Sequence, residues 1–127
     1  MLRVVLAALA AGALSACTTA PTTAAKPDTF WTVHHGTYNK AEQPEFMDCV
    51  FDGFLGAQNT AIATHVRQTK RAFGYRVDVI AQAFQYIVAD IHDDGTYELR
   101  RSKYSDMLPF SKEVDASAAC LKKFAGS

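Results

Sequence analysis

The spacing of apolar side chains changes along this chain, and each spacing is typical of a different kind of segment. Residues 4–14 are apolar almost without interruption, whereas residues 41–55 carry apolar side chains at helical spacing. Between residues 65 and 102, apolar and polar side chains alternate in short runs. Residues 111–125 return to the helical spacing. The pattern therefore predicts an apolar leader, a helix, a group of strands and a last helix.

The first predicted helix covers residues 41–55. Asn39 suits the cap position before it, and Pro44 is tolerated because it falls in the first turn. Its apolar side chains recur so that one face of the helix packs on a core. That inward stripe consists of Phe46, Cys49, Val50, Gly53 and Phe54.

The last predicted helix covers residues 111–125. Ser111 suits its cap, and Gly126 suits its end. Cys120 lies beside the apolar stripe that we expect to face the core. That stripe consists of Val114, Ala118, Leu121 and Phe124.

The alternating runs predict strands at residues 65–71, 75–81, 85–91 and 96–102. The dipeptide Asp94-Gly95 lies between the last two runs, where it is a strong signal for a hairpin turn. Alternation of this kind is typical of antiparallel strands with one face on a core. A helix over residues 60–72, ending at Gly74, remains an alternative to the first strand.

Together these segments predict a two-layer α+β domain over residues 30–127. A four-stranded antiparallel meander would be flanked by the N-terminal and the C-terminal helix on one face. In such a meander the first and fourth strands, residues 65–71 and 96–102, would form the two edges. The length of 127 residues allows one domain of this size and no second one.

Residues 1–16 have the order of a secretory signal: a positive start with Arg3, an apolar stretch, and small residues at the end. The apolar run is too short for a membrane span, which needs about 20 residues. The sequence Leu14-Ser15-Ala16-Cys17 resembles the lipobox of bacterial lipoproteins. An ordinary cleaved signal that happens to precede a cysteine is the alternative.

The resemblance implies cleavage before Cys17, diacylglycerol on its sulfur and an acyl chain on its new amine. Two or more acyl chains anchor a protein stably, where one is marginal. Thr18 in place of an aspartate implies an outer-membrane location facing the periplasm. Residues 17–29 contain Thr, Ala and Pro but no large apolar side chain, so we expect a flexible tether there.

Two of the three cysteines, Cys49 and Cys120, remain once Cys17 carries lipid. In an exported chain an even pair predicts a disulfide. By the chain-entropy account, closing so long a loop stabilises the fold by about 4 kcal/mol. Free buried thiols and redox or nucleophilic chemistry are the alternatives, although neither cysteine shows a C-x-x-C spacing.

The sequence contains no G-x-S-x-G, no glycine-rich phosphate loop and no H-E-x-x-H. The adjacent His34 and His35 would point opposite ways on an extended chain, so they chelate one metal poorly. His92, Asp93 and Asp94 offer possible ligands, but turn hydrogen bonding explains the aspartates more simply. We therefore expect no enzyme activity, no metal and no cofactor.

The chain has 13 basic and 13 acidic residues, so a nucleic-acid partner is not expected. Basic side chains nevertheless gather on two strands. The candidate binding surface consists of Arg76, Tyr86, Val88 and Arg100 on the sheet face away from the helices, with Arg67, Arg71 and Arg101 at the strand edges.

Each part of this surface has an alternative explanation. Charged edges also prevent strand addition by other chains. Tyr86 and Val88 would be inaccessible if residues 30–40 covered them, since Phe30 and Trp31 there need burial.

The resulting hypothesis is a small membrane-anchored envelope lipoprotein that acts as a non-catalytic binding or accessory module. Its partner would be an envelope protein or an anionic envelope polymer. The alternative is a surface-displayed inhibitor or exclusion factor against a foreign hydrolase or phage component. A third hypothesis is a small hydrolase or metal protein that uses His92, Asp93 and Asp94.

Overall fold

The computed structural model describes residues 29–58 and 61–126. Within them the chain is an α+β domain with one antiparallel sheet and two α-helices, which confirms the predicted class. The predicted signal peptide, the lipidation of Cys17 and nearly all of the tether lie outside the described residues.

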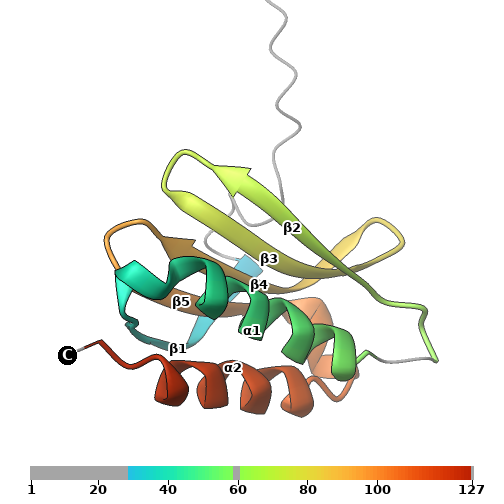
Figure 1. Cartoon of the computed structure of the whole chain (residues 1–127). Coiled ribbons are helices and arrows are strands. Elements are labelled where there is room, and N and C mark those ends of the chain that lie inside the picture. Colours follow the sequence, from blue (N-terminus) through green and yellow to red (C-terminus); the bar gives the residue numbers. More distant parts are fainter. Residues whose placement is uncertain (1–28, 59–60, 127) are drawn as a thin grey trace, which may run out of the picture.

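The first strand in the sequence lies at one edge of the sheet, next to the last strand in the sequence. The order across the sheet is β1-β5-β4-β3-β2, and all neighbours are antiparallel (Figure 1). The elements are β1 (Phe30–Thr37), the 3-10 turn η3 (Lys40–Glu42), α1 (Gln43–Gly56), β2 (His65–Arg71), β3 (Gly74–Ala81), β4 (Phe84–His92), β5 (Thr96–Ser102), the 3-10 turn η4 (Lys103–Met107) and α2 (Ser111–Lys123).

The predicted number of four strands was wrong, because residues 30–37 form a fifth strand, β1. β1 pairs with β5 from Phe30 opposite Ser102 to Thr37 opposite Thr96. The pairing shifts register between Thr32 and His34, and such an irregularity breaks the alternation by which a strand is recognised in a sequence. β5 is therefore an inner strand, and the prediction that it forms an edge was also wrong.

The other four strands agree with the alternating runs. Residues 60–72 contain β2 and no helix within their described part, so the strand alternative is confirmed. At the predicted hairpin, the backbone amide of Thr96 donates to the Asp94 carboxylate at 2.9 Å. Gly95 takes a φ of +91°, which glycine adopts without strain. Turn chemistry thus ends β4 and starts β5.

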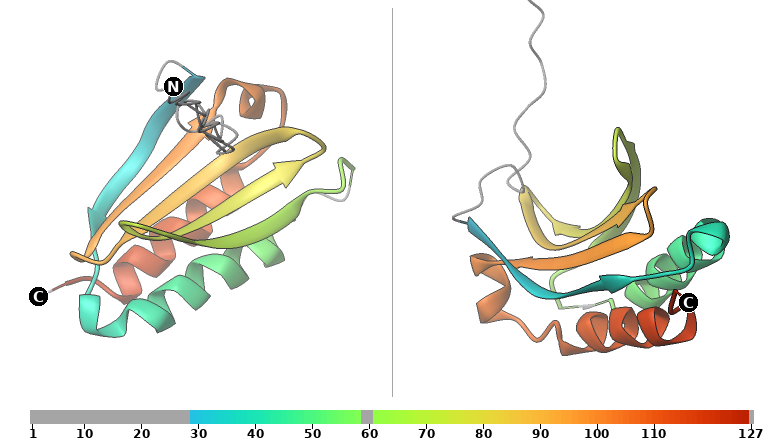
Figure 2. Two further views of the ribbon diagram at one scale, coloured as in Figure 1. Left: turned by 90° about the horizontal axis from the view of Figure 1, so that it is seen from above. Right: turned by 90° about the vertical axis from the view of Figure 1, so that its left-hand side faces the viewer.

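Both helices lie on one face of the sheet, which is curved (Figure 2). Phe46, Val50 and Phe54 of α1 are fully buried, as the helical spacing predicted. They pack against the inward-facing side chains of the inner strands. Those are Val77, Val79, Ile87, Ala89, Ile91, Tyr97 and Leu99.

The face that α2 presents to the core agrees in part with the predicted stripe, because Val114, Leu121 and Phe124 pack on the core as expected. Glu113, Ser117 and Cys120 are buried, whereas Ala118 is exposed. Ser117 forms a hydrogen bond with the hydroxyl of the buried Tyr97, which places a polar residue inward. The predicted cap was also wrong: the cap residue is Phe110, which makes no side-chain capping bond.

The structure joins Cys49 of α1 to Cys120 of α2 with an S–S distance of 2.02 Å and a Cα–Cα distance of 5.9 Å. The two helices also approach closely at Gly53. A Cβ there would lie 2.9 Å from the Cβ of Ala116, so glycine permits the contact. The disulfide and the small residues therefore hold the helical layer together beneath the sheet.

Candidate functional site

The face of the sheet that the helices leave uncovered, here called the open face, carries rows of paired residues across the strands. One row is Arg67, Asp78, Val88, Arg100 and Thr32, from β2 to β1. The neighbouring row is Thr69, Arg76, Asp90, Glu98 and His35. Because directly opposed residues share a face, these rows bring basic and acidic side chains together.

Asp90 is the centre of the second row. Its carboxylate accepts two hydrogen bonds from Arg76, at 2.6 Å from Nε and 2.9 Å from Nη2. Arg100 donates to the same carboxylate through Nη2. Arg76 and Asp90 are only 7% and 4% exposed, so this triad is a buried ionic group. The two-donor contact fixes the Arg76 guanidinium, since fork-shaped donors bind carboxylates with defined geometry, and Asp90 holds Arg100 through one further bond.

Asp78 forms a second ionic group near β2. Arg67 donates to its carboxylate from Nε at 3.0 Å and from Nη2 at 2.6 Å. Gln85 adds a third donor from β4. Asp78 is fully buried, while the Arg67 side chain is 47% exposed. The hydrogen bonds from Arg67 to Asp78 raise the pKa of Arg67. Arg67 therefore both covers a buried carboxylate and contacts solvent.

Of the residues predicted for this face, Arg76, Val88 and Arg100 are brought together, but Tyr86 is not among them. The β3–β4 pairing shifts register between Val79 and Ile80, and this places Tyr86 on the helix side. There its ring stacks on Phe110 with the centroids 5.3 Å apart. Tyr86 was therefore wrongly assigned to the open face.

Val88 does lie on the open face, but it is not accessible. Val88 is fully buried in a small cluster with Phe30 of β1. This agrees with the alternative that residues 30–40 cover it. Val88 therefore contributes to the stability of the open face rather than to a surface that a partner can touch.

The remaining arginines lie at different places. Arg71 is paired with Gly74 at the β2–β3 hairpin, at the β2 edge. Arg101 faces the helix side, where it donates to Ser105 at 2.9 Å and lies 6.0 Å from the Trp31 ring. The predicted surface thus separates into a buried ionic centre and dispersed basic side chains.

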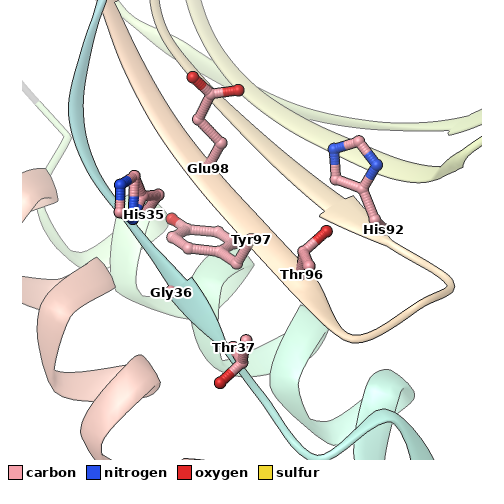
Figure 3. A pocket seen from close by; sticks show the side chains of 7 residues that line it. All are labelled: His35, Gly36, Thr37, His92, Thr96, Tyr97 and Glu98. Carbon is pink, nitrogen blue, oxygen red and sulfur yellow. The ribbon is translucent and has the colours of Figure 1, made fainter.

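One accessible part of the open face is a hollow of about 410 Å³, lined by residues of β1, β4 and β5 (Figure 3). Its lining consists of His35, Gly36, Thr37, His92, Thr96, Tyr97 and Glu98. The side chains of His92, Thr96 and Glu98 rise on the same side of the strands in Figure 3. The hollow therefore combines imidazole, hydroxyl and carboxylate groups.

Glu98 connects this hollow to the buried triad. One of its carboxylate oxygens accepts a hydrogen bond from the Thr32 hydroxyl at 2.5 Å, and the other lies 4.0 Å from Nε of Arg100. The Glu98 side chain is 38% exposed, whereas the Arg100 side chain is 17% exposed. Glu98 is thus held on two sides and still accessible to a partner.

Sequence reasoning did not find His35, Thr96 and Glu98 as one site. They meet because β1 pairs with β5, and that pairing was not predicted. The opposite orientations of His34 and His35 were predicted correctly. His34 faces the helix side with its ring 5.8 Å from the Tyr97 ring, and burial lowers its pKa.

The aspartates beside His92 have turn and surface roles. Asp93 accepts a hydrogen bond from Gln43 at 2.9 Å. Asp94 accepts bonds from the amide and hydroxyl of Thr96, and these bonds lower its pKa. Over residues 29–58 and 61–126, no group of three His, Cys, Asp or Glu residues is arranged to hold a metal ion.

Comparisons of the chain with protein-family models, with curated proteins and with solved structures gave no match. Among the described residues, no helix has the length and apolarity needed to cross a membrane. The function is therefore inferred from the geometry of the open face and its hollow.

Proposed function

We propose that the protein is a small lipid-anchored envelope lipoprotein that acts as a non-catalytic binding module. One observation carries the binding role: the buried Asp90 carboxylate fixes Arg76 and Arg100 directly beside the hollow that Glu98 and His35 line. The anchored location rests on the lipobox-like residues around Cys17.

A binding role is supported by the rigidity of this arrangement. Arg100 and Glu98 already have defined positions before any partner arrives, because Asp90 and Thr32 hold them. Side chains that are already ordered lose less conformational entropy on binding, which improves affinity. A buried ionic group is costly to desolvate, and well-packed apolar residues can often replace the whole group without loss of stability, so its presence is compatible with a functional role.

The chemistry of the hollow favours an envelope protein over an anionic polymer as the partner. Its accessible rim carries the Glu98 carboxylate and the hydroxyl of Thr96, and Arg100 is already engaged by Asp90. A polyanion would meet a carboxylate at this rim, which is unfavourable at close range. A protein segment that supplies both donors and acceptors would match these groups.

Site-specific photo-cross-linking in the native envelope tests the proposal. A photoreactive residue at Thr96 or at His35, both exposed, is expected to give the same protein adduct, identified by mass spectrometry. The matched control position is Lys122, which is exposed on α2 on the other side of the sheet. An adduct from Thr96 and His35 but not from Lys122 is the expected result.

A second variant tests whether the adduct depends on the chemistry of the hollow. Glu98→Lys reverses the accessible charge and is expected to abolish the adduct, while Lys122→Glu leaves it unchanged. Equal labelling at all positions, or an adduct that survives Glu98→Lys, would show that the hollow is not the binding site. Retention on an anionic polymer that is strengthened by Glu98→Lys would indicate the polymer instead.

A further inference from the structure

Exposed large apolar side chains gather at one end of the domain. The described residues include four that are markedly exposed, namely Trp31, Leu55, Phe84 and Met107. Leu55 lies near the end of α1, whereas the other three surround the turn η4. We call Trp31, Phe84, Tyr104 and Met107, together with Lys103, the η4 cluster.

Contacts among strands and turn hold the η4 cluster together. The rings of Phe84 and Tyr104 lie 4.7 Å apart, which joins the start of β4 to η4. Trp31 is paired with Arg101, and Arg101 in turn donates to Ser105 and Asp106 of η4. Trp31, Phe84 and Met107 remain 41%, 39% and 79% exposed. Phe84 and Tyr104 are thus in direct contact, and Trp31 is linked to η4 through Arg101, so these side chains belong to one end of the domain.

This end is also where the chain enters the domain. Figure 2 shows the start of β1, the β3–β4 hairpin and η4 at the same end of the sheet, while the C-terminal end of α2 lies at the opposite end. The predicted lipid carrier Cys17 is twelve residues before Thr29 in the sequence. Such a segment spans about 40 Å at most. An anchor at Cys17 would therefore limit the start of β1 to within about 40 Å of the bilayer, so this end of the domain can reach the membrane.

The composition of the η4 cluster suits the boundary between lipid and water. Trp and Tyr are favoured there because one part of each ring system is apolar and another part forms hydrogen bonds. Lys103 is exposed and can reach lipid phosphates while its methylene groups stay in apolar surroundings. An exposed methionine adds flexible apolar surface. Each of these side chains is common on protein surfaces. Their combination beside the proposed anchor indicates that a lipid bilayer contacts this end of the domain.

We propose that the η4 cluster inserts into the bilayer interface and orients the domain on the membrane that anchors it. The proposal rests on the lipid anchor of the proposed function, and it adds a second, non-covalent contact. The hollow lies near the β4–β5 turn, at the other end of the sheet. If the η4 cluster contacts the bilayer, the hollow is directed away from it.

Trp31 provides the measurement, because it is the only tryptophan in the chain. The mature full-length chain is reconstituted into vesicles of phosphatidylcholine and phosphatidylglycerol, with and without bromine on the acyl chains. Bromine quenches only a tryptophan that reaches the acyl region. We expect a blue-shifted Trp31 emission and quenching by the brominated lipid.

Two variants and a matched control assign the effect to the cluster. Met107→Asp and Phe84→Ser are expected to reduce the quenching several-fold, because each removes apolar contact with lipid. Leu55→Ser removes a side chain that is as exposed as Phe84, 41% against 39%, but lies on α1 and outside the η4 cluster, and it should leave the quenching unchanged. Met107 is so exposed that its replacement does not disturb the fold.

Three results would overturn the proposal: neither a blue shift nor quenching by the brominated lipid, quenching that Met107→Asp does not reduce, or a blue shift without quenching. The last of these would mean that a protein covers Trp31. Measuring the mass of the mature chain tests the lipid anchor separately from the η4 cluster. If Cys17 is unmodified, the proposed anchor fails, and adding the same chain to preformed vesicles still tests the η4 cluster.

Discussion

The two faces of the sheet are both buried at their centres, but by different means. The face toward α1 and α2 is covered by a helical layer and filled with apolar side chains. Among the described residues no helix lies on the open face, yet Asp78 and Val88 are fully buried there, and Asp90 is 4% exposed. Arginine side chains and Phe30 exclude water there.

The difference affects how each face tolerates change. Apolar contacts are non-directional and add up with area, so the helix side can adjust to modest substitutions. Ionic contacts in a buried setting depend on both partners, and removing one leaves the other charge without compensation. The open face is therefore expected to be the less tolerant of the two to loss of single polar atoms.

The largest expected effect concerns the helix side. Replacing both cysteines, Cys49→Ser with Cys120→Ser, removes a link between residues 71 apart. We expect the free energy of unfolding to fall by about 4 kcal/mol, from the gain in entropy of the unfolded chain. Urea unfolding of the wild type under oxidising and reducing conditions is the matched measurement. Equal midpoints in all three samples would contradict this expectation.

The next effect concerns the open face. Asp90→Asn leaves Arg76 and Arg100 without their shared carboxylate. We therefore expect the free energy of unfolding to fall by about 3 kcal/mol. Adding Arg76→Met to that variant should recover part of the loss, because it removes one of the unpaired charges. A double-mutant cycle by urea unfolding measures this coupling. Additive losses would show that the two side chains act independently.

Some parts of the fold could be predicted from the sequence, and others could not. α1 and strands β2 to β5 follow from periodic apolar positions and the Asp94-Gly95 turn. β1 was missed because its register shift near Val33 interrupts the alternation. The inward face of α2 was predicted only in part: Val114, Leu121 and Phe124 pack on the core, but the buried Glu113 and Ser117 were missed because they are polar. No periodicity rule assigns a polar side chain to a core.

Replacing Glu113 is expected to raise the stability of the protein, in contrast to the substitutions above. It is 1% exposed, and no other described residue offers its carboxylate oxygens a hydrogen bond. Burial raises its pKa above the ordinary value of 4.5. Between pH 4.5 and the raised pKa of the folded state, the folded protein holds a proton that the unfolded chain has released. The free energy of unfolding therefore falls as the pH rises through this range.

Glu113→Leu is therefore expected to stabilise the protein at pH 7 by about 1–3 kcal/mol, the cost of an unsatisfied buried polar group. The gain should shrink as the pH is lowered toward 4, where the wild-type carboxyl is protonated in both states. Thermal unfolding across this pH range measures the effect. A gain that does not change with pH would mean that ionisation of Glu113 is not its cause.

The smallest expected effect is at the rim of the hollow. Glu98→Gln removes a charge that is 38% exposed, so we expect a change in stability of less than about 1 kcal/mol. Its effect on the proposed cross-link should nevertheless be large. A loss of adduct together with an unchanged urea midpoint would separate binding from stability at this residue.

The site was less predictable than the fold. Arg76 and Arg100 were assigned to one face by alternation, and that assignment was correct. Tyr86 was misplaced by the register shift in the β3–β4 pairing, and His35 was considered only as a metal ligand, because its position beside β5 depends on the unpredicted strand β1. Both errors come from irregular strand pairing, which depends on contacts between distant residues rather than on local sequence.

The pairing of β1 with β5 also has a kinetic consequence. The hairpins from β2 to β5 join neighbouring segments, so they can form early and with little loss of chain entropy. β1 can pair only with a strand that lies 59 to 72 residues later in the chain, from Thr37 opposite Thr96 to Phe30 opposite Ser102. The disulfide also joins distant segments. We therefore expect β1 amides to gain protection from hydrogen exchange after those of β3 and β4 during refolding, and protection of β1 in the earliest phase would contradict this order.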